Sequence, residues 1–218
     1  MALNVLQWGI GVHPNIAFRG TSKQQNIEFV WQRSFGALVV NSARVSLISH
    51  VPFQLSDDGK SLEAHLVASN PILQALEVPT MAVMVVSGGD AYISPDWYGV
   101  ENQVPTWNYV AVHIGGRLKK LKPNELLGVL ERLSANMEKR LLPKPPWKLD
   151  KLSDEIFAKL KRQIVPVRME VDTIEGTWKL SQNKIKSAIE GVVQGASSAQ
   201  IGTEVSKITQ LMEGVSDK

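Results

Sequence analysis

The sequence has no cysteine among its 218 residues. Disulfide bonds, thiolate nucleophiles, iron–sulfur clusters and thiolate zinc sites are therefore excluded, and nothing in the composition indicates an oxidising compartment. The longest purely apolar run, Met81 to Val86, is far shorter than the roughly 20 residues that a membrane-spanning helix needs. The N-terminal segment lacks the basic region and cleavage site of a signal peptide. We therefore expect a cytoplasmic protein.

Common catalytic and metal-binding motifs are also missing from the sequence. HExxH, the P-loop, GxSxG and GxGxxG do not occur, and Gly9-Ile10-Gly11 lacks the third glycine of a dinucleotide motif. His13 and His50 fit no spacing of metal ligands, so we expect no metal site. No acid, base and nucleophile can be paired from spacing alone, and the sequence assigns no catalytic residue.

The positive charge is concentrated in the middle of the chain. The formal net charge is only +3, but residues 117–168 contain far more basic than acidic side chains. Such a block meets phosphates in nucleic-acid-binding proteins, and it is equally the solvated face of one or two helices in many other proteins. DNA binding through residues 117–162 and a purely solvated surface therefore both stay open. No basic recognition helix of a helix-turn-helix is evident.

Hydrophobic periodicity predicts an α+β fold that is mainly β. A barrel-like domain is expected over residues 1–182, with helices inserted near 123–162, and a C-terminal helical extension over 183–218 that packs on the barrel. Two turns are expected inside strand regions, at Gly88-Gly89-Asp90 and at Gly176, where a positive φ would require glycine. The predicted helices lie at 22–34, 71–76, 123–140 and 152–162, with two more after 183 separated by a Gly/Ser-rich break at 195–198; the predicted strands lie at 37–40, 45–49, 52–55, 61–67, 80–87, 91–94, 106–118, 164–171 and 173–180.

The densest feature of the sequence is an aromatic segment from Ala91 to His113. It contains two of the six Trp and all three Tyr, together with polar residues such as Ser94, Thr106 and Asn108. Rings with polar neighbours can line a pocket for a planar ligand. The same pattern is typical of a packed strand corner or a subunit interface.

Three segments resemble the PaiB family of FMN-binding negative transcriptional regulators. The first reads Tyr-Ile-Ser-Pro-Asp-Trp-Tyr from residue 92 and continues as Val-Pro-Thr-Trp-Asn-Tyr from residue 104. The second is Ile-Glu-Gly-Thr-Trp-Lys-Leu-Ser-Gln-Asn-Lys over 174–184, and the third is His-Leu-Val-Ala-Ser-Asn-Pro over 65–71. The resemblance runs in order from about Phe35 to Met212.

The resemblance implies an FMN-binding split β-barrel with peripheral helices, a homodimer with its ligand pockets at the subunit boundary, and a repressor function. Ala68 stands where the family usually has an Arg, which removes one donor for the FMN phosphate. Two alternatives remain: a flavin-dependent oxidoreductase of the same fold, and an interaction module that has lost its cofactor. The residues expected to contact the ligand are His65, Ser69, Asn70, Ser94, Trp107, Asn108, His113, Lys179 and Gln182.

Overall fold

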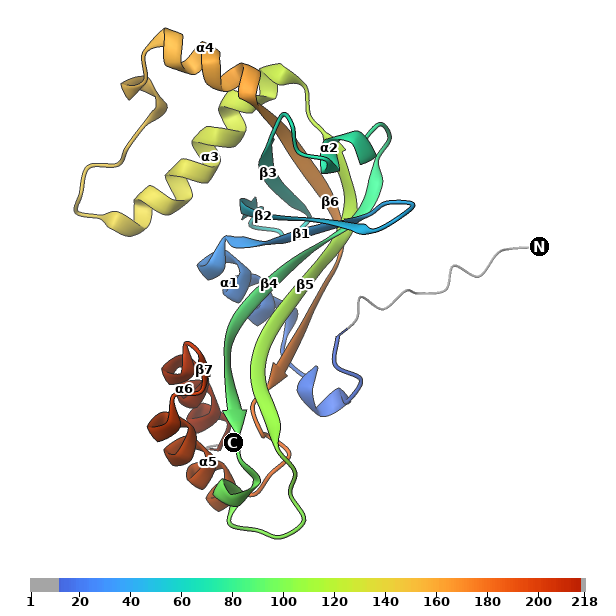
Figure 1. The fold of residues 1–218 in the computed structure, drawn as a ribbon. Coiled ribbons are helices and arrows are strands. Elements are labelled where there is room, and N and C mark those ends of the chain that lie inside the picture. Colours follow the sequence, from blue (N-terminus) through green and yellow to red (C-terminus); the bar gives the residue numbers. More distant parts are fainter. Residues whose placement is uncertain (1–11, 217–218) are drawn as a thin grey trace. The chain divides into compact units, whose positions relative to one another are not determined.

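The computed structural model describes residues 12–216, and Figure 1 shows their fold. The strands are β1 (Phe35–Asn41), β2 (Ser46–Leu55), β3 (Ser61–Val67), β4 (Thr80–Ile93), β5 (Thr106–Lys120), β6 (Ile164–Lys179) and β7 (Gly202–Thr203). The α-helices are α1 (Lys23–Arg33), α2 (Ile72–Ala75), α3 (Leu126–Glu138), α4 (Asp154–Gln163), α5 (Lys186–Ala199) and α6 (Val205–Ser216). Short 3-10 helices include Pro95–Tyr98, Pro123–Glu125 and Lys139–Leu141.

The strands form one sheet that closes on itself. Its order is β1-β2-β3-β6-β5-β4-β7, and an additional pairing joins β1 to β4. That pairing is antiparallel and matches Ala37–Val40 of β1 with Ala82–Val85 of β4. A sheet whose first strand pairs with a later one has no open edge there, which defines a barrel. The predicted α+β split barrel is therefore confirmed.

Local sequence signals explain where several elements begin and turn. Ser22 caps α1, since its hydroxyl accepts a hydrogen bond from the Gln25 amide at 3.1 Å. The hairpin between β2 and β3 turns at Gly59, whose φ is +68°, and the carboxylate of Asp58 accepts from the Lys60 amide at 3.0 Å. An Asp-Gly step is typical of hairpin turns, and Asp58-Gly59 forms the turn here.

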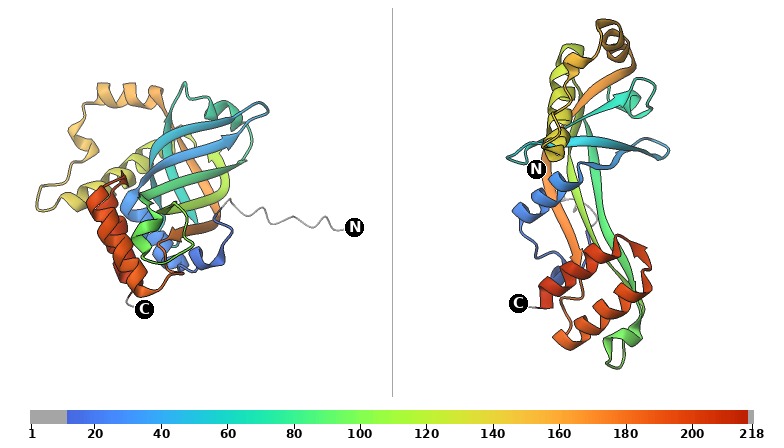
Figure 2. Two further views of the ribbon diagram at one scale, coloured as in Figure 1. Left: turned by 60° about the horizontal axis from the view of Figure 1, so that its bottom comes forward. Right: turned by 90° about the vertical axis from the view of Figure 1, so that its left-hand side faces the viewer.

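The chain divides into two compact units, and β4, β5 and β6 contribute to both. Unit 1 consists of the described residues through Asn26, Ser87–His113 and the residues from Glu175 onward. Its core includes Val110, Val112 and Trp178, together with apolar residues of α5 and α6, which lie side by side (Figure 2). Unit 2 consists of Ile27–Val86 and Ile114–Ile174. Its core is made by the inward faces of the strands, including Leu38, Phe53, Leu62, Met84, Ile114 and Met169.

Several predicted breaks are continuous elements in the structure. β4 runs through Gly88 and Gly89, so the predicted turn at this place is wrong. Both glycines are buried. Before them the more exposed residues of β4 have odd numbers and after them even numbers, a change of face that is typical of a β-bulge. β2 and β6 are likewise single strands where two were predicted. α5 passes through the Gly/Ser-rich segment and ends at Ala199, because the αL residue is Gln200, with a φ of +53°.

Gly176 is not in a turn. It lies inside β6 and is not among the glycines with positive φ, so the predicted reason for a glycine is wrong. The actual reason is contact: a Cβ at this position would lie 2.2 Å from the Asn26 Oδ1. Only glycine lets Asn26 approach the strand so closely.

Candidate functional site

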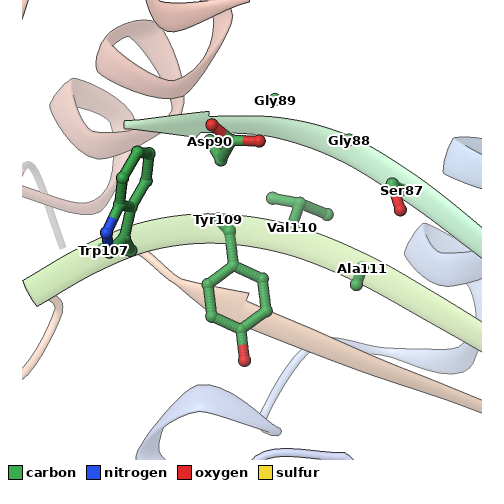
Figure 3. A pocket seen from close by; sticks show the side chains of 8 residues that line it. All are labelled: Ser87, Gly88, Gly89, Asp90, Trp107, Tyr109, Val110 and Ala111. Carbon is green, nitrogen blue, oxygen red and sulfur yellow. The ribbon is translucent and has the colours of Figure 1, made fainter. Parts of the chain in front are cut away.

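A pocket of about 400 Å³ lies on unit 1 where β4 and β5 run side by side (Figure 3). Its volume is within the usual range for small-ligand sites. Backbone and small side chains of β4 form one side, and aromatic and apolar side chains of β5 form the other. The lining residues are Ser87, Gly88, Gly89, Asp90, Trp107, Tyr109, Val110 and Ala111.

Aromatic side chains continue beyond the pocket along the surface of unit 1. Trp107 is 46% exposed, and its ring meets Tyr92 edge to face with the ring centroids 6.0 Å apart. Tyr92 meets Trp97 in the same way at 6.3 Å. We call Tyr92, Trp97 and Trp107 the aromatic cluster. A large apolar ring that is half-exposed inside a pocket offers a face for a planar ligand.

Trp97 is held in place by two glycines of α5. A Cβ at Gly195 would lie 2.3 Å from the Trp97 ring, and a Cβ at Gly191 would lie 2.3 Å from the Trp97 carbonyl oxygen. Gly191 and Gly195, of which Gly195 lies in the predicted helix break, therefore allow α5 to pack against this 3-10 segment, and the helix is not interrupted.

Asn108 lies on the opposite, buried face of β5. Its Nδ2 donates to Ser181 Oγ at 2.8 Å and contacts Met212 Sδ at 3.4 Å, and Tyr98 and Ser181 share a hydrogen bond through their hydroxyls at 3.1 Å. Asn108 Oδ1 is buried without a hydrogen-bond partner in the described part of the chain. The side chain therefore anchors the strand from within, and does not line the pocket.

Four further residues predicted for the site belong to unit 1 and do not line the pocket. The Lys179 ammonium donates to Thr106 Oγ1, and burial lowers the pKa of Lys179 below its usual value. Gln182 accepts from the Leu180 amide at 2.8 Å and donates to the Trp178 carbonyl at 2.6 Å, so both ends of its amide are used. Ser94 is half-buried and precedes the 3-10 helix that carries Trp97. His113 is half-buried in β5.

The remaining predicted residues lie in unit 2, at the end of β3. Asn70 is used locally, since its Oδ1 accepts from the Ile72 amide at 3.0 Å and its Nδ2 donates to Ser49 Oγ at 2.6 Å. Ser69 is exposed. His65 is half-buried, its Nδ1 has no hydrogen-bond partner among the described residues, and burial lowers the pKa of its imidazole. A neutral imidazole with an unused ring nitrogen can still bind a ligand.

The two parts of FMN, its isoalloxazine ring and its phosphate, can each be compared with these residues. The aromatic cluster and the glycine backbone fit the flat isoalloxazine ring. The phosphate carries close to two negative charges and needs cationic or multiple hydrogen-bond donors, whereas the residues that line the pocket include the acid Asp90 and no Lys or Arg. The unit 1 pocket thus fits the ring, and none of its lining residues supplies a cation for the phosphate.

The sequence predicted Trp107 but missed the part of the pocket on β4. Gly88, Gly89 and Asp90 were interpreted as a turn because two adjacent glycines usually interrupt a strand. In the structure Gly89 serves close packing instead, since a Cβ there would lie 3.0 Å from the carbonyl oxygens of Thr203 and Glu204. The Asp90 carboxylate also accepts from the Thr203 amide at 2.9 Å. Only the pairing with β7 reveals this arrangement, and β7 is too short to be found from its pattern.

The comparisons with known proteins agree with this fold. Residues 12–173 match a family described as "Putative FMN-binding domain". A Bacillus subtilis protein named protease synthase and sporulation protein PAI 2 is 30% identical over 198 residues, which cover 90% of this chain and 94% of that protein. An uncharacterized protein of Aspergillus fumigatus is 26% identical over 204 residues, covering 72% of this chain and 77% of that protein.

Two solved structures have a similar fold at low identity. The FAD and heme binding protein of Mycobacterium smegmatis gives a TM-score of 0.54 at 12% identity, covering 74% of this chain and 73% of that chain. The flavocytochrome Anf3 of Azotobacter vinelandii gives a TM-score of 0.52 at 14% identity, covering 77% of this chain and 72% of that chain.

The closed antiparallel barrel and its fold relatives place the protein in the class of flavin-type split barrels. Within that class, the match over residues 12–173 shows that the chain belongs to the FMN-binding-domain family, and the resemblance to PaiB is confirmed.

The described residues give no sign of a metal centre or a membrane span. Among them, no group of three or more His, Asp or Glu is placed to hold a metal ion. None of the helices they form is both long and apolar enough to cross a membrane.

Proposed function

We propose that this protein is a PaiB-type regulator that binds FMN through the pocket on β4 and β5. The observation that carries the proposal is Trp107, which is 46% exposed at a pocket of ligand size. Leaving so large a ring in water forgoes the stabilisation that burial would give, about 1.5–3 kcal/mol for a large apolar side chain. Such an exposed ring in a concave site is typical of ligand binding.

In this proposal the protein holds and orients the flavin. Trp107 stacks on the isoalloxazine ring, Tyr92 supports Trp107 from its edge, and Trp97 supports Tyr92 in turn. Bound FMN supplies reversible electron transfer. The regulatory role is inferred from the resemblance to PaiB and from the name of the Bacillus subtilis relative.

A homodimer belongs to the proposal, and an apolar face of unit 2 supports it. Phe35 of β1, Ile48 of β2 and Met81 of β4 are 54%, 60% and 59% exposed. The strands that carry them are paired, since β1 lies between β2 and β4. Large side chains gathered on one sheet face are typical of an interface. We infer that a second copy covers this face.

DNA binding is proposed through the basic segment 117–162. In α4 the cations Lys159, Lys161 and Arg162 are all exposed, and the Lys161 ammonium lies 4.4 Å from the centre of the Phe157 ring. Such a helix would contact phosphates without reading bases, so binding would weaken steeply with salt.

The pocket can be tested with two substitutions of Trp107. FMN affinity of Trp107→Ala should fall about 10-fold relative to the unmodified protein, because a stacked ring contributes on the order of 1 kcal/mol or more. Trp107→Phe keeps a ring and should bind nearly normally. Titration with FMN, followed by quenching of flavin fluorescence, measures both. Equal affinity in a folded Trp107→Ala protein would remove this pocket from the site.

One observation favours a second function. No cation lines the pocket, and Ala68 stands where the PaiB family usually has an Arg. A protein that has lost the phosphate site would act as a cofactor-free interaction module, with the aromatic cluster binding a protein partner. The FMN titration separates the two functions, because only the first predicts saturable binding.

A further inference from the structure

A second cleft, of about 490 Å³, lies within unit 2 between α3 and the β2–β3 hairpin. One wall is formed by Arg132 and Asn136 of α3 and by Lys139, which begins the 3-10 helix that follows α3. The other wall is formed by the hairpin, with Gln54, Asp57 and Glu63 among its polar side chains. Ser56, Ser61 and Ala135 complete the lining.

At the base of this cleft, one carboxylate is shared by two guanidinium groups. Glu63 is only 8% exposed. It accepts from Arg132 at 2.7 and 3.0 Å and from Arg168 at 2.8 and 3.1 Å. Arg168 also pairs with Glu125 at 3.6 Å, so two carboxylates balance the charge of this arginine, whereas Arg132 faces Glu63.

The cationic side of the cleft has donors that the protein does not use. The side chain of Arg132 is 52% exposed, and its contacts with Glu63 employ Nε and Nη2. Within the described residues, no ion pair or hydrogen bond engages the side chain of Lys139, which is exposed. A ligand carboxylate could therefore bind both cations.

The hairpin side of the cleft offers acceptors. Gln54 Oε1 is buried and has no partner in the described part of the chain, although its Nε2 donates to the Leu55 carbonyl at 3.2 Å. Buried acceptors of this kind usually receive a hydrogen bond from a ligand or a water. Asp57 is exposed at the same wall and carries a negative charge. A group with N–H donors and positive charge would match both residues.

We propose that the α3–hairpin cleft binds a small zwitterion of the free amino-acid class. The ligand carboxylate would lie against Arg132 and Lys139, and its ammonium or amide group against Asp57 and Gln54. Such a site would let a regulator respond to nitrogen-containing metabolites. The inference does not depend on flavin binding, because none of these residues lines the unit 1 pocket.

The test is calorimetric titration of the full chain with each of the twenty common L-amino acids. At least one should bind with a Kd below about 1 mM, a free energy near −4 kcal/mol. The same amino acid with its carboxylate amidated should bind at least 10-fold more weakly. The whole experiment is run with and without FMN, and flavin retention is measured separately, so the two proposals can fail independently.

Substitutions then locate the bound amino acid. Lys139→Gln and Asp57→Asn alter exposed side chains and should leave folding intact, and each should weaken binding about 10-fold. Lys60→Gln is the matched control, because Lys60 is an exposed cation of the same hairpin that does not line the cleft. The proposal is overturned if no amino acid binds at millimolar concentration, or if both cleft variants bind as well as the control.

Discussion

At the scale of single residues, one asparagine shows why a glycine is required in the middle of a strand. Asn26 Oδ1 accepts a hydrogen bond from the Trp178 indole at 2.8 Å, and both side chains are buried. The Asn26 amide reaches this position because Gly176, two residues before Trp178 on the same strand, has no side chain. A buried polar group is tolerable only when it is hydrogen-bonded, so these three residues form one unit.

The substitution Gly176→Ala should therefore destabilise the protein by about 2–4 kcal/mol. Its methyl group would displace Asn26 and leave the Trp178 indole without an acceptor. Urea unfolding, followed by tryptophan fluorescence, measures the loss. Gly214→Ala is the control, because nothing lies within 4 Å of a Cβ there and Gly214 is inside α6. That change should be neutral or stabilise by up to about 1 kcal/mol. Equal stability of the two variants would contradict this explanation of Gly176.

Sequence patterns identified residues whose chemistry is local and missed those whose role depends on a distant partner. Trp107 could be predicted because it lies in a dense aromatic segment. The actual partner of Gly176, in contrast, is 150 positions away in the sequence. Gln182 and Asn70 were predicted as ligand contacts from the family motifs, whereas their amides bind nearby backbone or side-chain groups.

At the scale of elements, Glu63 connects α3 to the sheet. It lies on β3 and binds Arg132 of α3 and Arg168 of β6. In sequence, a lone acid inside an apolar strand gives no indication of two arginines that lie 69 and 105 residues away. Buried carboxylates need such partners, because an unpaired buried charge is costly.

Glu63→Gln should cost about 2–4 kcal/mol in the free energy of unfolding, slightly less than a fully buried pair because Arg132 is half-exposed. Glu170→Gln is the matched control: its carboxylate pairs with Lys119 at the surface, where both side chains are well exposed. The control should change stability little. Chemical denaturation at neutral pH measures both variants, and a Glu63→Gln protein as stable as the control would refute the structural role of the cluster.

The same cluster predicts a pH dependence. Although burial alone would raise it, the pKa of Glu63 is lowered overall by its hydrogen bonds to Arg132 and Arg168. A carboxylate whose pKa is lowered in the folded state stabilises the protein at pH values above the pKa of the unfolded state, which is near 4.5. That stabilisation is lost as the pH falls from 4.5 through the lower pKa that Glu63 has in the folded state. The unmodified protein should therefore lose more stability than Glu63→Gln between neutral pH and that acidic range. The prediction is contradicted if the free energy of unfolding of the two proteins changes in parallel with pH.

The order and type of most elements followed from periodicity, but their lengths did not. Strands 45–49 and 52–55 were separated because Pro52 interrupts the pattern, whereas Pro52 lies inside β2 opposite Phe35. Pro52 has no N–H to donate, and it lies where β2 passes from its pairing with β1, which ends at Pro52, to its pairing with β3, which begins at Phe53. Glycine and proline residues therefore led to predicted breaks at places where the structure has continuous strands.

At the scale of the whole molecule, the proposed dimer and DNA surface can each be tested. Ile48→Asp together with Met81→Asp places charges on the exposed face of the sheet, where burial against a second copy would be costly. Light scattering should give a dimer for the unmodified protein and a monomer for this variant. Leu141→Asp together with Leu142→Asp serves as the control. These two leucines are 50% and 61% exposed and lie outside that face. A variant that stays dimeric would place the interface elsewhere.

DNA binding should depend on the cations of α4. Replacing Lys159, Lys161 and Arg162 with Gln should weaken binding to a duplex of random sequence and reduce the salt dependence by about one unit of slope per lost cation. Fluorescence anisotropy over a range of salt concentrations measures both effects. An unchanged slope would show that α4 does not contact the phosphates.

The central claim is that the pocket on β4 and β5 makes this chain a flavoprotein. The most direct measurement is the visible absorption spectrum of the purified protein, mixed with FMN and then passed through a desalting column. The account predicts retained flavin bands close to one FMN per chain, and their loss in Trp107→Ala but not in Trp107→Phe. A colourless protein that releases all added FMN would contradict the claim and leave the cofactor-free module as the function to pursue.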